Sequence, residues 1–342
     1  MAQHFLLSSR ARDLDIGEIH RLSDADARNR FRELCWPDTN GEPVCPSCGG
    51  MDHWTLVAGA KWKCKDCKLQ FTPTSDTCFK GRKLSYRQLL VCAAIFANGV
   101  NGVAACRMAR EMKVAYKSAF VLLHKIREIM GKDEDAARLG GVVEIDGAIF
   151  GGSMPRLPNT KALWAEFFKK NKAAARRKRR LIVVLRERRG LDPDVPPKVR
   201  TFLLGKEGDA VEIARRIVMP DTILHADFST QWEPLNLYFD TKRINHSESY
   251  SKDGACTNQA ESFFSRMRTA QRGVYKIISG AHLSRYAMEL GWREQYSRKS
   301  NGTQHAIIIG AVGRSKPSRT FLGYWRKRPA NDNGDFFAQF AA

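Results

Sequence analysis

The chain has 342 residues, 43% of them hydrophobic, and its 57 lysine and arginine residues outnumber its 36 aspartate and glutamate residues, giving a net charge of +21. This charge favours a polyanionic partner, and the lack of an apolar run long enough for a bilayer favours nucleic acid over a membrane. The N-terminus lacks a signal-peptide pattern, so we expect a cytoplasmic globular protein whose nine cysteines are metal ligands or free thiols.

The first segment, residues 1–35, has apolar side chains near helical spacing and predicts a helical lead with Ser23 and Asp24 as candidate caps. The next segment, residues 36–80, is rich in cysteine, glycine, proline and lysine and predicts short strands and turns. A region of this size has little core of its own, so a bound metal would supply folding energy.

Two C-x-x-C pairs are the sharpest local signal in the sequence. Cys45 and Cys48 form the first pair, Cys64 and Cys67 the second, and fifteen residues separate the pairs. Two such turns joined by a hairpin complete a tetrahedral sulfur site, which predicts a structural Zn²⁺ and a zinc ribbon. The alternative is a redox pair or chance spacing. We expect the remaining five cysteines to be small core residues: Cys35, Cys78, Cys92, Cys106 and Cys256.

Residues 84–132 predict helices, and within them residues 101–130 predict two helices separated near Lys113. The second helix carries an apolar stripe along one face, and its start, "AYKS", is polar and exposed. This is the pattern of a helix-turn-helix, whose second helix enters the major groove of DNA. An ordinary helical hairpin gives the same pattern, and the net charge favours the DNA-binding interpretation.

Residues 141–298 alternate strand-like and helix-like segments and predict an α/β domain with a mixed sheet. The order is three strands, a helix, a strand and then helices. The first strand, "VVEIDGAIFGG", carries Asp146 within an apolar run, where a charge needs a partner or a metal. Asp227 falls at the C-terminal end of the fourth strand, where sites in such sheets gather.

A helix is predicted downstream, with Thr257 as its candidate cap. Glu261 and Arg268 share one of its faces, and Asn258 lies one turn before Glu261. Three carboxylates from different elements, Asp146, Asp227 and Glu261, suffice to hold two hard divalent cations for phosphodiester chemistry. Alternatively, these acids only end a strand, start a turn and face solvent.

The sequence resembles the insertion-sequence DDE transposases with an N-terminal zinc ribbon, the ISXO-like group. Besides the cysteine pairs, the matching stretches include "LHADFSTQW", "TNQAESFFSRMR" and "HLSRYAMELGWREQYSRK", and they extend from about residue 30 to 327. The resemblance implies a ribonuclease H-like catalytic domain of a bacterial, nucleoid-associated enzyme. It implies DNA cleavage and strand transfer at the inverted repeats of a mobile element and into target DNA, with Mg²⁺ or Mn²⁺.

The resemblance also assigns roles. Asp146 and Asp227 match the first two acids of the family. Either Asn258 or Glu261 matches the third position, and we favour Glu261 because a charged oxygen is the better magnesium ligand. Arg268 stands where the family usually has lysine, and it would hold phosphate in a bidentate grip. We expect a homo-oligomer when the protein is assembled on DNA.

The expected organisation is a helical lead (1–35), a zinc ribbon (36–80), a helix-turn-helix-like segment (84–132), a catalytic domain (141–298) and a basic tail (299–342). Between Lys161 and Arg180 the sequence holds nine basic residues and one acid, which predicts an arm that contacts phosphates. The alternative function is a DNA-binding regulator in which the zinc ribbon and helix-turn-helix accompany an inactive transposase-like domain.

Overall fold

The fold is taken from a computed structural model, which describes residues 5–131, 138–151, 163–166, 169, 179–190, 195–244 and 256–324. The chain divides into two compact units. The first unit combines residues 1–135 with residues 296–342, and the second consists of residues 136–295. Among the described residues, no helix has the length and apolarity needed to cross a membrane.

The first unit contains a small antiparallel sheet in the order β1-β2-β3. Its strands are β1 (His53–Val57), β2 (Lys61–Cys64) and β3 (Gln70–Phe71). Its core is small: the rings of Trp62 and Phe71 pack beside Cys45 and Cys64. So few apolar side chains bury little surface, and the sheet depends on its cysteines for further stability.

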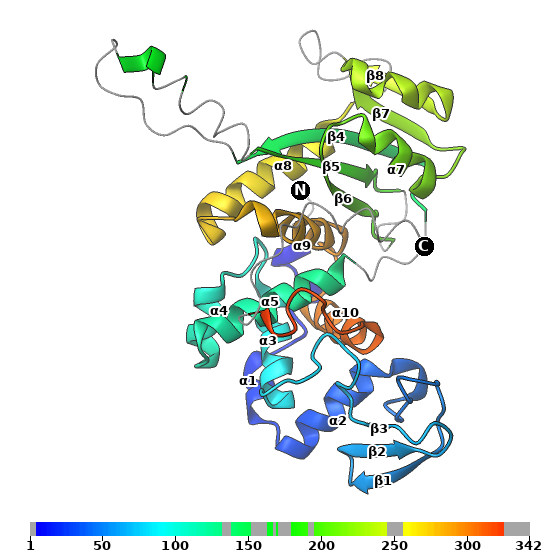
Figure 1. The fold of residues 1–342 in the computed structure, drawn as a ribbon, viewed down its shortest axis with the longest axis vertical. Helices are drawn as coiled ribbons and strands as arrows, with labels where there is room; N and C mark the ends of the chain where they lie inside the picture. Colours follow the sequence, from blue (N-terminus) through cyan, green and yellow to red (C-terminus); the bar gives the residue numbers. More distant parts are fainter. Residues whose placement is uncertain are drawn as a thin grey trace. The chain divides into compact units, whose positions relative to one another are not determined.

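In the described part of the first unit, helices are more extensive than strands (Figure 1). They are α1 (Ile16–Arg21), α2 (Asp24–Cys35), α3 (Tyr86–Asn98), α4 (Ala105–Met112), α5 (Tyr116–Met130) and α10 (Asn301–Arg314), with short 3₁₀ turns at Phe5–Leu7, Ser9–Ala11 and Pro37–Thr39. As predicted, Ser23 caps α2, because its hydroxyl accepts the N–H of Asp26 at 3.1 Å.

The segment expected as a tail begins with α10, which packs against α2 and α3 of the same unit. The approach is close: a Cβ at Gly313 would lie 2.3 Å from the carbonyl oxygen of Cys35. The buried ring of His305 also forms a 3.1 Å hydrogen bond with the carbonyl of Leu90 in α3. The described part of residues 299–342 therefore contributes to the core of the first unit.

The helix pair α4–α5 has the predicted break. Lys113, at the end of α4, is in the left-handed region with φ of 51°, which turns the chain before α5 begins at Tyr116. The predicted stripe on α5 is buried, while residues 115–118 are exposed. The stripe consists of Ala119, Leu122, Ile126 and Ile129.

The second unit is built on a five-stranded mixed sheet in the order β6-β5-β4-β7-β8. The strands are β4 (Val142–Phe150), β5 (Arg180–Glu187), β6 (Val199–Leu204), β7 (Ile223–Asp227) and β8 (Asp240–Ile244). Strands β4, β5 and β6 pair in antiparallel fashion, whereas β4–β7 and β7–β8 are parallel pairs.

Four of these strands were predictable from the sequence, whereas β8 was not. Its five residues, DTKRI, are mostly polar, and Ile244 is the one fully buried member. A short polar strand at a sheet edge has little apolar periodicity to reveal it.

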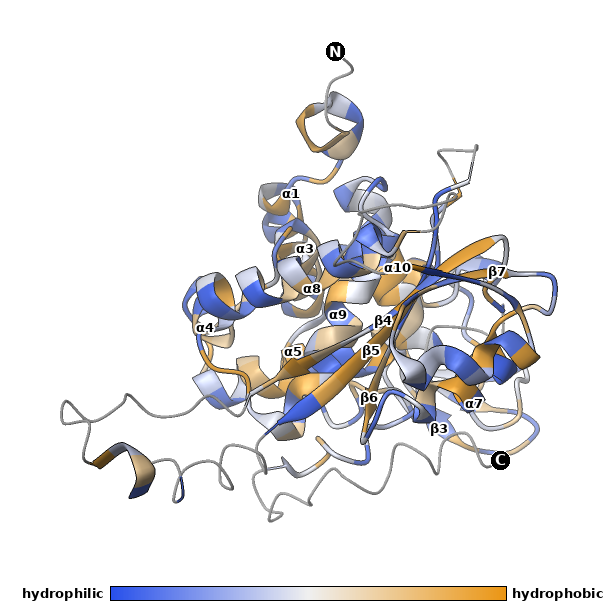
Figure 2. Cartoon of the chain, turned by 90° about the horizontal axis from the view of Figure 1, so that it is seen from above, coloured by the Kyte–Doolittle hydropathy of each residue, from blue (hydrophilic) through white to orange (hydrophobic). Residues whose placement is uncertain are grey.

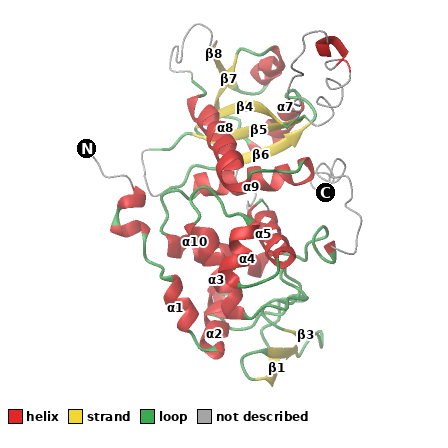
Figure 3. Ribbon diagram, turned by 90° about the vertical axis from the view of Figure 1, so that its left-hand side faces the viewer, coloured by secondary structure: helices red, strands yellow, loops and turns green. Residues whose placement is uncertain are grey.

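The second unit also contains the helices α7 (Asp209–Ile217), α8 (Asn258–Ala270) and α9 (Leu283–Gln295), with 3₁₀ turns at Thr230–Leu237 and Gly280–His282. A π-helical turn, Gln271–Tyr275, continues α8. Figure 3 shows α8 and α9 alongside β4, β5 and β6. On this face of the sheet, Ala148 and Phe150 of β4 pack against Phe263 and Phe264 of α8.

The central strands owe their position to burial. Residues 182–185 of β5 are fully buried, and the strand is largely orange in the hydropathy view of Figure 2. Strands covered on both faces are apolar along most of their length. The two acids of β4, Glu144 and Asp146, are exceptions to this pattern and need their own explanation.

Candidate functional site

The four predicted zinc ligands come together in the small sheet. The sulfur atoms of Cys45, Cys48, Cys64 and Cys67 all lie within 4.8 Å of one another. Cys45 Sγ lies 3.4 Å from Cys67 Sγ, and Cys48 Sγ lies 3.5 Å from Cys64 Sγ. In a tetrahedral site with Zn–S bonds of about 2.3 Å the sulfur atoms stand about 3.8 Å apart, so the set fits Zn²⁺.

The two cysteine pairs use the same turn. The residue after each pair is left-handed: Gly49 has φ of 74° and Lys68 has φ of 62°. Backbone N–H groups then point at the sulfur atoms: that of Gly50 at Cys48 and that of Leu69 at Cys67. The hydrogen bond from Leu69, together with those to neighbouring thiols, lowers the pKa of Cys67 to about 7. The N–H of Gly50 also lowers the pKa of Cys48, but hydrogen bonds with the other thiols raise it overall. A thiolate is the form that binds a metal, and the turn favours that form at Cys67.

The five other cysteines differ from one another. Cys35, Cys78 and Cys92 are buried, as expected for core residues, whereas Cys106 is exposed and Cys256 is half-buried. The expectation was therefore wrong for the last two. Cys256 lies two residues before α8, and Arg188 donates to its carbonyl oxygen at 3.2 Å and to its sulfur.

Asp146 and Asp227 lie on adjacent strands of the second unit. The parallel register pairs Glu144 with His225 and Ile145 with Ala226, so the next residues along the two strands are Asp146 and Asp227. Each carboxylate accepts a local backbone N–H: Gly147 donates to Asp146 at 2.7 Å, and Ser229 donates to Asp227 at 3.1 Å.

The electrostatics of Asp146 are unusual for a carboxylate. Burial raises its pKa to about 7, and the negative charges of Asp227, Glu261 and Glu207 add to the shift, whereas the hydrogen bond from Gly147 opposes it. Burial is the main cause of this shift, and the three neighbouring carboxylates add negative charge that a bound cation would offset.

The third candidates lie on α8. Glu261 and Asn258 are exposed in its first turns, and the charge of Glu261 acts on Asp146. Arg268, two turns further along, is exposed and places its guanidinium 5.5 Å from the ring centre of Phe150 at the end of β4. Thr257 occupies the predicted cap position, but the capping hydrogen bonds of α8 come from Glu144 instead.

Glu207 is a further acid at this place, and the sequence analysis missed it. It precedes α7, and a Cβ at Gly147 would lie 2.8 Å from its Oε1. Burial and the charge of Asp227 raise the pKa of Glu207, whereas a hydrogen bond with the Ser229 side chain lowers it. Only the glycine that follows Asp146 hints at a close neighbour in the sequence.

Comparison with protein families gives two matches. The family model for the ISXO2-like transposase domain matches residues 138–295, and the model for the transposase zinc-ribbon domain matches residues 22–70. The first match covers the whole described sheet of the second unit, and the second covers all four clustered cysteines.

The chain belongs to the ISXO2-like transposase family.

The searches of curated proteins and of solved structures returned no significant match to this transposase. The family match supports a transposase that acts on DNA, and the zinc-ribbon match together with the cysteine cluster supports bound Zn²⁺.

The acids of the transposase are less tightly gathered than its cysteines. Among the described residues, three or more histidine, cysteine or acidic side chains place their ligand atoms within 4.8 Å of one another only at the four cysteines. The acids act on Asp146 through their like charges, which a bound cation would offset. Their oxygen atoms are nevertheless the ligands that Mg²⁺ and Mn²⁺ prefer.

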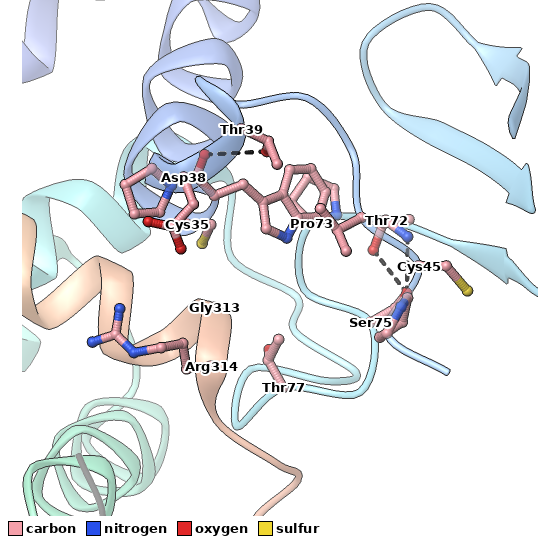
Figure 4. A pocket seen from close by; sticks show the side chains of 14 residues that line it. Cys35, Asp38, Thr39, Cys45, Thr72, Pro73, Ser75, Thr77, Gly313 and Arg314 are labelled. Carbon is pink, nitrogen blue, oxygen red and sulfur yellow. Dashed lines mark hydrogen bonds between the residues drawn. The ribbon is translucent and has the colours of Figure 1, made fainter. Parts of the chain in front are cut away.

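The first unit of the transposase also contains a hollow of about 240 Å³, seen in Figure 4. Asp38 and Arg314 lie among its lining residues, beside Thr72 and Cys45. It contains a single carboxylate and none of the predicted catalytic residues, so it is not the candidate catalytic site.

Of the nine basic residues in the arm predicted between Lys161 and Arg180, six lie outside the described residues. Lys169 and Arg179 are exposed, and Arg180 begins β5.

Proposed function

We propose that this transposase cleaves DNA strands at the ends of its mobile element and joins them to target DNA. Two observations support the proposal: Asp146 and Asp227 are the next residues on adjacent parallel strands, and Glu261 approaches them from α8. The strand order, with three antiparallel strands followed by two parallel ones, supports a ribonuclease H-like catalytic domain.

Each residue has a distinct part in this proposal. Asp146, Asp227 and Glu261 hold divalent cations, with Asn258 as the alternative third residue. Bound Mg²⁺ or Mn²⁺ supplies activation of the attacking oxygen and stabilisation of the leaving oxygen of a phosphodiester. Arg268 holds a phosphate of the DNA, and Phe150 keeps its guanidinium at the end of β4.

The first unit carries DNA recognition in this proposal. On the zinc ribbon, the exposed ring of Trp54 lies 4.9 Å from Lys68 Nζ and 5.8 Å from Lys63 Nζ, which gives a positively charged surface. On the helix pair, the exposed start of α5 is placed to enter the major groove. Because an element has two ends, we also propose that the protein acts as a homo-oligomer on DNA.

The decisive variant is Asp146→Asn, which keeps the shape and removes the charge. Cleavage of a labelled element-end duplex with Mg²⁺ should fall by about 10² or more, because a cation ligand is lost. A mobility shift on the same duplex should stay unchanged, since the first unit binds the DNA.

Cleavage by Asp146→Asn at the rate of the parent would refute the catalytic assignment. A parent protein that binds the duplex but cuts it with neither Mg²⁺ nor Mn²⁺ would instead indicate the regulator with an inactive transposase-like domain.

A further inference from the structure

Glu144 is a fully buried carboxylate, two residues before Asp146 on the same strand and the same face of the sheet. Its Oε1 accepts a hydrogen bond from Arg188 Nε at 2.8 Å. Its Oε2 accepts the backbone N–H groups of Gln259 at 2.8 Å and Ala260 at 3.0 Å. A buried charge is stable only when its hydrogen-bonding capacity is used, and here both oxygens have partners.

The two N–H groups belong to the first turn of α8. They are the groups that an N-cap side chain usually binds, and here the acceptor lies 115 residues earlier in the chain. A carboxylate at this position also interacts favourably with the positive end of the helix dipole. Glu144 therefore fastens the start of α8 to β4.

A second set of contacts holds Cys256, the residue before the cap position of α8. Arg188, already bound to Glu144, donates to the carbonyl of Cys256 at 3.2 Å. The N–H of Cys256 donates to Nδ1 of His225 at 3.2 Å. His225 is the sheet neighbour of Glu144 and precedes Asp227 by two residues. The strands that carry both acids are thus connected to the entry of α8.

The helix then runs alongside β4. At its start Glu144 contacts Gln259 and Ala260, and further along the ring of Phe150 lies 6.2 Å from that of Phe264. Asp146 lies between these contact points on β4, and Glu261 lies between them on α8. Apart from this pair, Glu144 is the one carboxylate in the sequences of β4 and α8.

We propose that Glu144 is a positioning residue, which anchors the first turn of α8 to β4 and so sets Glu261 opposite Asp146. The proposal rests on the proposed function in one respect, because it takes Glu261 as an active-site acid. Glu144 itself touches neither DNA nor cation in this role.

Hydrogen exchange of the full chain, without DNA and without added Mg²⁺ or Mn²⁺, tests the anchor. In Glu144→Gln the amides of Gln259 and Ala260 should exchange about tenfold faster than in the parent, because a charged acceptor has been lost. Unchanged exchange at these two amides would overturn the proposal. If Glu144→Gln cannot be recovered folded, Glu144→Asp, which retracts the carboxylate by one methylene group, is judged by the same criterion.

Glu187→Gln is the matched control. Glu187 is another shielded carboxylate of the second unit that accepts two backbone N–H groups, from Gly140 at 2.9 Å and Lys198 at 2.8 Å, remote from α8 in its contacts. Its replacement should weaken its own contacts and leave exchange at Gln259 and Ala260 unchanged. Faster exchange there in both variants would show general loosening and overturn the specific anchor.

A double-mutant cycle tests whether Glu144 acts through Glu261. Single-turnover cleavage by Glu144→Gln/Glu261→Gln should match that by Glu261→Gln within about twofold, because the positioned group is already absent. Independent losses that multiply would overturn the positioning role. Cleavage by Glu261→Gln at the parent rate would refute Glu261 in the proposed function, while the exchange experiment would still decide the anchor.

Discussion

The two candidate metal sites of this transposase are assembled in different ways. The four cysteines come from two short turns within the span of residues 45–67, and their sulfur atoms lie within 4.8 Å of one another. The acids come from β4, β7 and α8, and they influence one another through charge without forming so compact a group. A site built from local turns is prepared by those turns, whereas a site built from distant elements depends on how the elements are fastened together.

The largest effect should follow from removing a ligand of the four-cysteine site. Replacing Cys64 with Ser removes one of four thiolates from a sheet with a very small core, so the zinc should be lost and β1–β3 should unfold. Metal analysis should find about one zinc per parent chain and less than about a tenth of that in the variant. Cys106→Ser, at an exposed cysteine outside the cluster, is the control and should keep its zinc.

The next largest effect should distinguish the two third-ligand candidates on α8. Glu261→Gln should lower the cleavage rate by about 10² or more, because Glu261 is the residue whose charge reaches Asp146. Asn258→Ala should lower it by less than about tenfold. The measurement is single-turnover cleavage at saturating duplex, and the reverse ranking would assign the third position to Asn258.

The raised pKa of Asp146 should also make the stability of the protein depend on pH. The pKa of Asp146 rises from about 4 in the unfolded chain to about 7 in the folded protein. Between these values the folded state binds a proton that the unfolded state lacks. The stabilising contribution is therefore present below about pH 4 and is lost as the pH rises through 7.

Urea denaturation of the full chain without Mg²⁺ or Mn²⁺ measures this dependence. The parent should lose stability between pH 4 and pH 7, and Asp146→Asn should show a flatter profile and a higher stability at pH 8. Equal slopes for the two proteins would contradict the assigned pKa.

The smallest effect should come from Gly147→Ala. The added Cβ would lie 2.8 Å from Glu207 Oε1, so Glu207 must move away from β4. If Glu207 contributes to the negative field at Asp146, cleavage should fall by about three- to tenfold and the pKa of Asp146 should decrease. Gly190→Ala, where an added Cβ meets open space, is the control.

The same contrast explains what the sequence could predict. The cysteine site was predictable because spacing within 23 residues defines it, and β4 to β7 were predictable from apolar runs. The capping of α8 was not, because the sequence points to Thr257, whereas the acceptor is Glu144 in a distant strand. Glu207 was missed for a similar reason: it lies in a loop without periodicity, and folding alone brings it to Gly147.

The return of the chain to the first unit has a consequence for synthesis. The chain passes from the first unit to the second after residue 135 and returns at residue 296. The first unit is complete only when α10 packs onto α2 and α3. A ribosome must therefore produce the entire second unit before the first unit can close its core. A message that stops before α10 leaves the apolar faces of α2 and α3 uncovered, so we expect truncated products to be good substrates for cellular proteases.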